Sequence, residues 1–165
     1  MNGEFKIASW IFLFLKCFKM IRSLFFFFIS VCFSSSSWIA NDISGVWVNS
    51  DKDAHIKIYA SYGKYYGHVV WMKTPIDSTT GKPQLDKLNK DTDLRSLPVM
   101  NMIVLMNLEF DADDQEWNGG TIYNPKSGSS YDVFCRMIDE DTLEMHFYLS
   151  FQSLGKIFLW NRISQ

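Results

Sequence analysis

Apolar and polar side chains alternate with a period of two residues from about position 44 onward. The clearest example runs from Leu143 to Leu149, where every second residue is apolar. A period of two places alternate side chains on opposite faces of an extended chain, so this pattern predicts strands with one buried face. Seven further stretches are expected to be extended: 45–49, 54–60, 65–72, 99–110, 116–123, 130–138 and 156–163.

Short segments rich in Asp, Asn, Gly, Ser and Lys separate these stretches, and such residues favour turns. Eight strands at short spacing indicate an all-β protein in which neighbours pair antiparallel. Closure into an up-and-down barrel removes the exposed edges of such a sheet. We therefore expect a single antiparallel β-barrel of about eight strands. At that strand number the interior is filled by side chains or holds one small ligand.

Residues 73–98 interrupt the rhythm of strands and turns. This stretch contains Pro75, Gly81, Pro83 and Pro98 and is otherwise mostly polar. Loops of this length in compact domains often act as lids or binding loops. We expect one long loop here, with room for a short helix around residues 85–89.

The first 40 residues differ in composition from the rest, and they hold nine of the 14 Phe. Arg22 precedes the uncharged apolar run 24–33, which is followed by a run of serines. A basic residue, an apolar core of this length and small residues after it are typical of a cleaved signal peptide. We interpret residues 20–40 as a signal peptide and residues 1–19 as an extension from an over-long reading frame. An uncleaved membrane anchor is the alternative.

The domain expected after cleavage, residues 41–165, carries 12 basic and 17 acidic side chains. Its length suits one domain. The acidic balance argues against nucleic acid as a partner, because phosphate binding needs clustered Lys and Arg. Cys135 is its one cysteine, so we expect no internal disulfide and a core position for this residue. We predict a periplasmic or secreted monomer without a membrane span in the mature chain.

Two short motifs stand at the ends of the strand pattern: Gly45-Val46-Trp47 opens the first strand and Trp160-Asn161-Arg162 closes the last. This pair resembles the calycin barrels, the lipocalin-like group. In these barrels an early Gly-x-Trp places an indole across the base, and a late Arg stacks on that ring. The resemblance implies that Gly45, Trp47, Trp160 and Arg162 close one end of the barrel, where a guanidinium over an indole gains cation–π energy.

A longer set of motifs covers roughly residues 45–162. It comprises Tyr66-Gly67 with Trp71, Gly81-Lys82-Pro83 with Asp86 and Asn89, Leu94-Arg95 before Pro98, the run Trp117 to Pro125, Gly128, Tyr131 and Leu154-Gly155. With these motifs the chain resembles a family of exported bacterial domains of unknown function, number twenty-one forty-seven. The resemblance implies a lipocalin-like barrel and an exported location, and it implies no reaction.

The chain departs from the family pattern at several positions. Leu97 stands where relatives tend to have a second Arg before the Pro, and His146-Phe147 stands where they tend to have Arg-Gly. Asn101 and Ser150 stand where glycines are usual. If those arginines bind an anionic ligand in relatives, the departures put that ability in doubt for this chain.

One constellation suggests a ligand site: Trp71, Asp86, Asn89, Arg95, Trp117, Tyr123 and Tyr131. The aromatic members lie on expected strands, and the polar members lie in the long loop. A polar loop over an aromatic mouth is typical of a pocket for a small ligand. The alternative is that Asp86 pairs with Arg95 to fix the loop, while the aromatic residues fill the core.

Other chemistry has little support in the sequence. His55, His68 and His146 lie on separate expected strands, and residues 111–116 lack the Gly that an EF-hand calcium loop requires. There is no Gly-x-Ser-x-Gly motif and no Gly-rich phosphate loop. We predict no catalytic residue, no metal site and no cofactor.

We therefore expect an exported, non-catalytic barrel protein that binds a small, partly apolar molecule. The alternatives are an envelope or host-facing module that binds a protein partner through a fully packed barrel, and a hydrolase acting on an envelope component. A cavity of ~300 Å³ or more would favour ligand binding. An enzyme would instead show titratable groups converging in that cavity.

Overall fold

The computed structural model describes residues 42–163 of the chain. The leader expected at 20–40 and the extension at 1–19 lie outside the described residues. Within 42–163, no helix is both long enough and apolar enough to cross a membrane.

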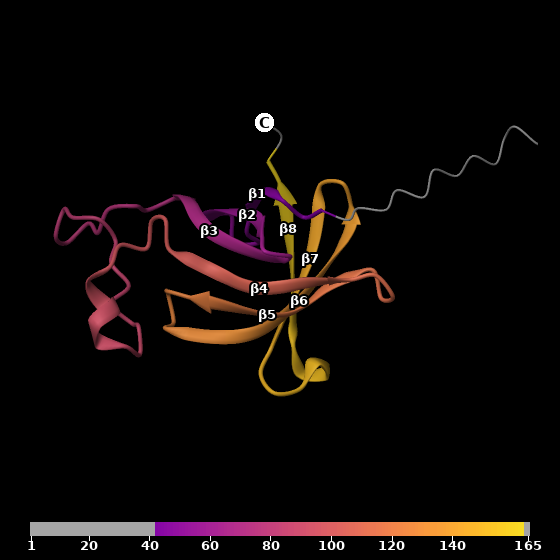
Figure 1. The fold of residues 1–165 in the computed structure, drawn as a ribbon. Coiled ribbons are helices and arrows are strands. Elements are labelled where there is room, and N and C mark those ends of the chain that lie inside the picture. The colour runs from indigo at the N-terminus through magenta and orange to yellow at the C-terminus, as the bar shows by residue number, and fades with distance from the viewer. Residues whose placement is uncertain (1–41, 164–165) are drawn as a thin grey trace, which may run out of the picture. The chain divides into compact units, whose positions relative to one another are not determined.

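Eight strands follow one another and close into an antiparallel barrel, in which β1 pairs with β8 (Figure 1). This confirms the up-and-down β-barrel that the sequence predicts. The strands are β1 (Gly45–Val48), β2 (Ala54–Ser61), β3 (Lys64–Met72), β4 (Ile103–Asp111), β5 (Glu116–Asn124), β6 (Ser129–Asp139), β7 (Thr142–Tyr148) and β8 (Lys156–Arg162), with short 3-10 helices η1 (Thr92–Ser96) and η2 (Gln152–Leu154).

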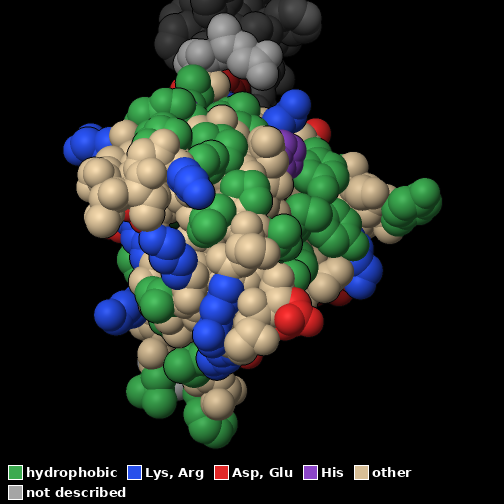
Figure 2. All heavy atoms as spheres, turned by 90° about the vertical axis from the view of Figure 1, so that its left-hand side faces the viewer, with side chains coloured by type: hydrophobic (Ala, Val, Ile, Leu, Met, Phe, Trp, Pro, Cys, Tyr) green, Lys and Arg blue, Asp and Glu red, His purple; other side chains and the backbone are tan. Residues whose placement is uncertain are grey.

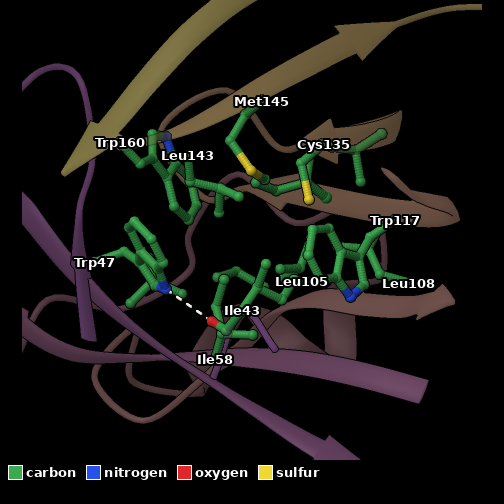
Figure 3. Close-up of a cluster of buried hydrophobic side chains, with 14 of the residues drawn as sticks. Ile43, Trp47, Ile58, Leu105, Leu108, Trp117, Cys135, Leu143, Met145 and Trp160 are labelled. Carbon is green, nitrogen blue, oxygen red and sulfur yellow. Dashed lines mark hydrogen bonds between the residues drawn. The ribbon is translucent and has the colours of Figure 1, made fainter. Parts of the chain in front are cut away.

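Alternate side chains of the strands form a buried hydrophobic cluster inside the barrel (Figure 3). Leu143 and Met145 of β7 and Val133 and Cys135 of β6 are fully buried. These positions are two residues apart, as expected for a strand with one face inside the barrel. Cys135 therefore fills the core, and burial raises the pKa of its thiol far above the usual range.

The connection between β3 and β4 runs from residue 73 to 102, four residues longer than the sequence predicts. Asn101 adopts a left-handed φ of 65°, and its N–H donates to Val69 O, so the chain turns there before β4 starts. The short helix is at Thr92–Ser96 rather than at 85–89. Asp91 caps it by accepting the Asp93 N–H at 3.0 Å, which satisfies a free donor of the first turn.

The two ends of the barrel differ in how the strands are joined. At one end, tight hairpins connect β2 to β3, β4 to β5 and β6 to β7. At the other end lie the turn 49–53, the long loop 73–102, the turn 125–128 and the loop 149–155 that carries η2. We refer to these as the closed end and the open end.

Candidate functional site

A cavity of about 680 Å³ lies within the barrel at its open end. Small-molecule sites usually have volumes of ~300–1,000 Å³, so this cavity has the size of a ligand site. Its deeper wall is apolar and comes from strands all around the barrel: Ile56, Val69, Val104, Ile122, Phe147, Phe158 and Trp160. Polar groups of the turns 49–53 and 124–126 form its rim.

Aromatic rings dominate one side of the cavity. Phe147 of β7 packs against Phe158 of β8, with ring centroids 4.7 Å apart, and meets Trp160 edge to face at 6.5 Å. Tyr131 of β6 also stacks on Phe147, with ring centroids 6.5 Å apart. Such rings offer a large, rigid apolar surface to a ligand.

An ion-pair cluster ties two turns together across the rim. The Lys126 ammonium, in the turn after β5, contacts Asp53 Oδ2 and lies 3.9 Å from Asp51 Oδ2. Asn49 Nδ2 donates to Asp53 Oδ1 at 2.8 Å. Burial acts to raise the pKa of Asp53, but the hydrogen bonds from Lys126 and Asn49 outweigh it and leave that pKa below its usual value.

Asp86 holds the long loop against the barrel wall. Its side chain is fully buried and accepts the Tyr123 hydroxyl at 2.7 Å and Asn89 Nδ2 at 2.6 Å. Its backbone N–H donates to Leu97 O at 3.0 Å. Because Tyr123 lines the cavity, this cluster supports the wall from behind. Desolvation, reinforced by the hydrogen bond to Asp86, raises the pKa of Tyr123 to about 12.

The pairing of Asp86 with Arg95 that the sequence offered as an alternative is wrong. Arg95 is exposed on η1, and its Nε donates to the backbone oxygen of Asn89 at 2.7 Å. The loop is therefore fixed by a neutral hydroxyl and an amide, while Arg95 braces the loop from outside.

The structure divides the seven candidate ligand residues into groups. Tyr123 and Tyr131 line the cavity, and Asp86 and Asn89 lie behind Tyr123. The remaining three lie outside the cavity: Arg95 at the surface of the loop, Trp71 on the outer face and Trp117 in the core of the closed end.

The rings next to Trp71 and Trp117 show where these two indoles lie. Trp71 is 41% exposed and stacks on His55 with centroids 4.3 Å apart, on the outside of β2 and β3. Trp117 is fully buried and packs against Phe110 at 4.9 Å and Tyr65 at 6.1 Å. Neither indole lines the cavity.

The closed end contains the stacked pair expected from the calycin resemblance. The Arg162 guanidinium carbon lies 4.3 Å from the centre of the Trp47 ring. Arg162 Nη1 donates to Ser44 O at 2.6 Å, and its Nε donates to Glu140 O at 2.8 Å. A Cβ at Gly45 would lie 2.5 Å from Nη1, so only glycine leaves room for the guanidinium. Trp160, expected in the same closure, lies at the cavity floor instead.

Several cavity residues were not singled out from the sequence as a site, namely Asn49, Asp53, Lys126, Lys156, Phe147 and Phe158. The period of two on the last strand does place Lys156 and Phe158 on the same face as Trp160. No local signal joins Asp53 to Lys126, because they are 73 positions apart and meet only when the barrel closes.

The fold and the cavity define a lipocalin-like β-barrel. Residues 45–162 match the family described as "Uncharacterized protein conserved in bacteria (DUF2147)", and the chain belongs to this family. The family resemblance read from the motifs is thus confirmed.

Among solved structures, the chain is similar to protein HP1028 from the human pathogen Helicobacter pylori, which is described as belonging to the lipocalin family. The two share 24% sequence identity with a TM-score of 0.64, over 75% of this chain and 84% of that one. A comparison with curated proteins finds no match.

Proposed function

We propose that this protein is an exported, non-catalytic carrier that holds one small, partly apolar molecule inside its barrel. The cavity of about 680 Å³ at the open end is the observation that carries the proposal. An apolar wall with a few polar groups at the rim suits a ligand that enters with its apolar part first.

The cavity favours a carrier over a protein-interaction module with a packed barrel. In such a module the inward-facing side chains would meet at the barrel axis, as they do around Trp47 and Trp117 at the closed end. At the open end, residues such as Ile122 and Phe158 face free volume instead. Buried apolar surface that faces no partner atoms loses dispersion contacts, and a ligand would restore them.

The state of the rim favours binding over catalysis. Its two carboxylates, Asp51 and Asp53, face the Lys126 ammonium, and Asn49 donates a further hydrogen bond to Asp53. A general base needs a free lone pair within reach of a substrate proton. These carboxylates are instead used to join two turns.

Titration with the neutral fluorophore N-phenylnaphthylamine tests the carrier proposal. Ile122 faces the cavity and Thr121, its neighbour in β5, does not line it. We expect saturable binding to the wild type, a loss of ~10-fold or more in Ile122→Phe, and little change in Thr121→Phe. Absence of binding to the wild type, or equal binding by both variants at equal stability, would contradict the proposal.

Export is tested separately in bacterial cells. We expect the product in the periplasm or the medium, with residues 20–40 removed, because the leader has the organisation of a cleaved signal peptide. Intact mass of the recovered protein measures the cleavage. Full-length chain in the cytoplasm, or in membranes after a carbonate wash, would refute it.

A further inference from the structure

We propose that the ligand is an amphiphile with a single anionic head group, and that Lys156 holds this group at the cavity mouth. This inference rests on the proposed carrier function and adds the chemical class of the molecule carried. It comes from the geometry of β8, the charges at the mouth and the distribution of charge over the barrel.

Lys156 lies at the start of β8, directly opposite Phe147 of β7. Side chains alternate along a strand, so Lys156 shares a face with Phe158 and Trp160, which line the wall and floor. Its exposed side chain thus sits at the rim, above an apolar wall. Among residues 42–163, the ion pairs that form involve other cations, and none engages the Lys156 ammonium.

The carboxylates of the mouth are already engaged elsewhere. Lys126 contacts Asp53 and lies 3.9 Å from Asp51, and Asn49 donates to Asp53. Lys156 is therefore the charged side chain of the cavity lining that forms no ion pair. A neutral ligand gains nothing from it, whereas an anionic group gains a charge-assisted hydrogen bond.

The wider charge distribution has the same sign. The segments of the open end, together with Lys156, carry eight basic and six acidic side chains. The rest of residues 42–163 carries four basic and 11 acidic side chains, so the open end is a positive region on an acidic protein. Figure 2 shows Lys and Arg outnumbering Asp and Glu on the face that carries the long loop. Such a field attracts anions and repels cations.

The arrangement also fixes the orientation of the ligand. The apolar chain would pack on Phe147, Phe158 and Trp160 in the interior, and the head group would remain at the rim where water reaches it.

A pair of probes that differ only in the head group tests the inference. Displacement of N-phenylnaphthylamine by decanoic acid and by decanol would be measured above the pKa of the acid, with wild type, Lys156→Met and Lys57→Met. Lys57 is an exposed lysine of β2 outside the cavity and serves as the control. We expect the wild type and Lys57→Met to bind the acid about five-fold more tightly than the alcohol. This ratio corresponds to the modest energy of a partly exposed ion pair. Lys156→Met should bind both equally, and added salt should reduce the preference of the wild type.

Three results would overturn the inference. Equal binding of acid and alcohol to the wild type would show that the ligand needs no anionic head group. A preference for the acid that survives in Lys156→Met would show that Lys156 does not hold the head group. Both results leave the carrier function intact. Failure of both probes and of the fluorophore to bind removes the carrier function as well.

Discussion

At the scale of single residues, polar side chains hold the two ends of the barrel in different ways. At the closed end, Arg162 lies over Trp47 and donates to two backbone oxygens, Ser44 O and Glu140 O. At the open end, Asp86 accepts two hydrogen bonds in a fully buried position. Removal of either group leaves donors or acceptors without partners, which costs more than the net value of the bonds themselves.

Arg162→Ala should lower the free energy of unfolding by ~1–3 kcal/mol, since it removes the cation–π contact and the hydrogen bonds that seal the closed end. Arg162→Lys should recover only part of the loss, because an ammonium cannot stack as a planar group. Urea denaturation measures both. Arg136→Ala is the control, because this arginine pairs with Glu144 at the surface and should contribute ~1 kcal/mol or less. An unchanged midpoint for Arg162→Ala would show that the contact between Trp47 and Arg162 does not stabilise the barrel.

Asp86→Ala should destabilise the protein by ~2–3 kcal/mol, because the Tyr123 hydroxyl and the Asn89 amide lose a buried acceptor. Arg95→Ala, a change in the same loop at an exposed side chain, should stay within ~0.5 kcal/mol of the wild type. Denaturant midpoints compare the two variants. Equal midpoints for Asp86→Ala and Arg95→Ala would show that the loop does not depend on the buried carboxylate.

Tyr123 should make stability fall as the pH rises between about 10 and 12. Its pKa is raised from 10.0 to about 12 in the folded protein, so the unfolded chain loses this proton first. Stability from this group is complete below pH ~10 and is lost as the pH approaches the folded value. Tyrosinate absorbance, wild type minus Tyr123→Phe, measures the titration. A midpoint near 10 would contradict the link to burial and Asp86.

At the scale of elements, the turns at the open end carry backbone conformations that side chains rarely adopt. Asn101 and Ser150 have φ of 65° and 66°, in the left-handed region that favours glycine. At Ser150 the chain makes a tight turn, in which the Phe151 N–H donates to Leu149 O at 2.7 Å. Because neither residue is glycine, both positions carry a steric cost.

Ser150→Gly should therefore stabilise the barrel by ~1 kcal/mol, since glycine removes the steric cost of a left-handed residue. Asn101→Gly should gain less, because Asn tolerates this region better than Ser. Thermal or urea unfolding measures both. A loss of stability in Ser150→Gly would mean that the greater freedom of glycine in the unfolded chain outweighs the relief of strain.

At the scale of the whole molecule, the barrel is asymmetric in both packing and charge. The closed end is filled by side chains such as Trp47 and Trp117, whereas the open end holds the cavity. The positive charges gather around the mouth, while acidic turns such as 111–116 and 139–141 lie at the closed end. The Trp47–Arg162 pair does not line the cavity, so variants of this pair should change stability and leave the cavity unchanged.

A chain limited to residues 41–165 should fold on its own and unfold in a single transition. Every strand and both members of the Trp47–Arg162 pair lie within it, and residues 40–165 form one compact unit. Circular dichroism should show β-structure, and denaturation should be cooperative. A spectrum dominated by helix, or one of an unfolded chain, would refute the independence of the barrel.

The sequence by itself determined the number, order and approximate limits of the strands. Alternation with a period of two depends only on neighbouring residues, so it can be recognised without knowledge of the fold. The stretch from Leu143 to Leu149 is an example. Closure also followed, because eight consecutive antiparallel strands leave edges that a barrel removes. The motif at Trp47 and Arg162 even identified the two residues that meet at the closed end.

Only the tertiary structure decided which aromatic residues face the cavity. Alternation separates two faces of a strand but does not say which end of the barrel a position occupies, so Trp117 entered the closed core and Trp160 the cavity floor. A register shift between His55 and Ile56 places Trp71 on the outer face beside His55. The rim of the cavity is formed by turns that are distant in sequence and come together only when the barrel closes. No local sequence pattern predicts these contacts.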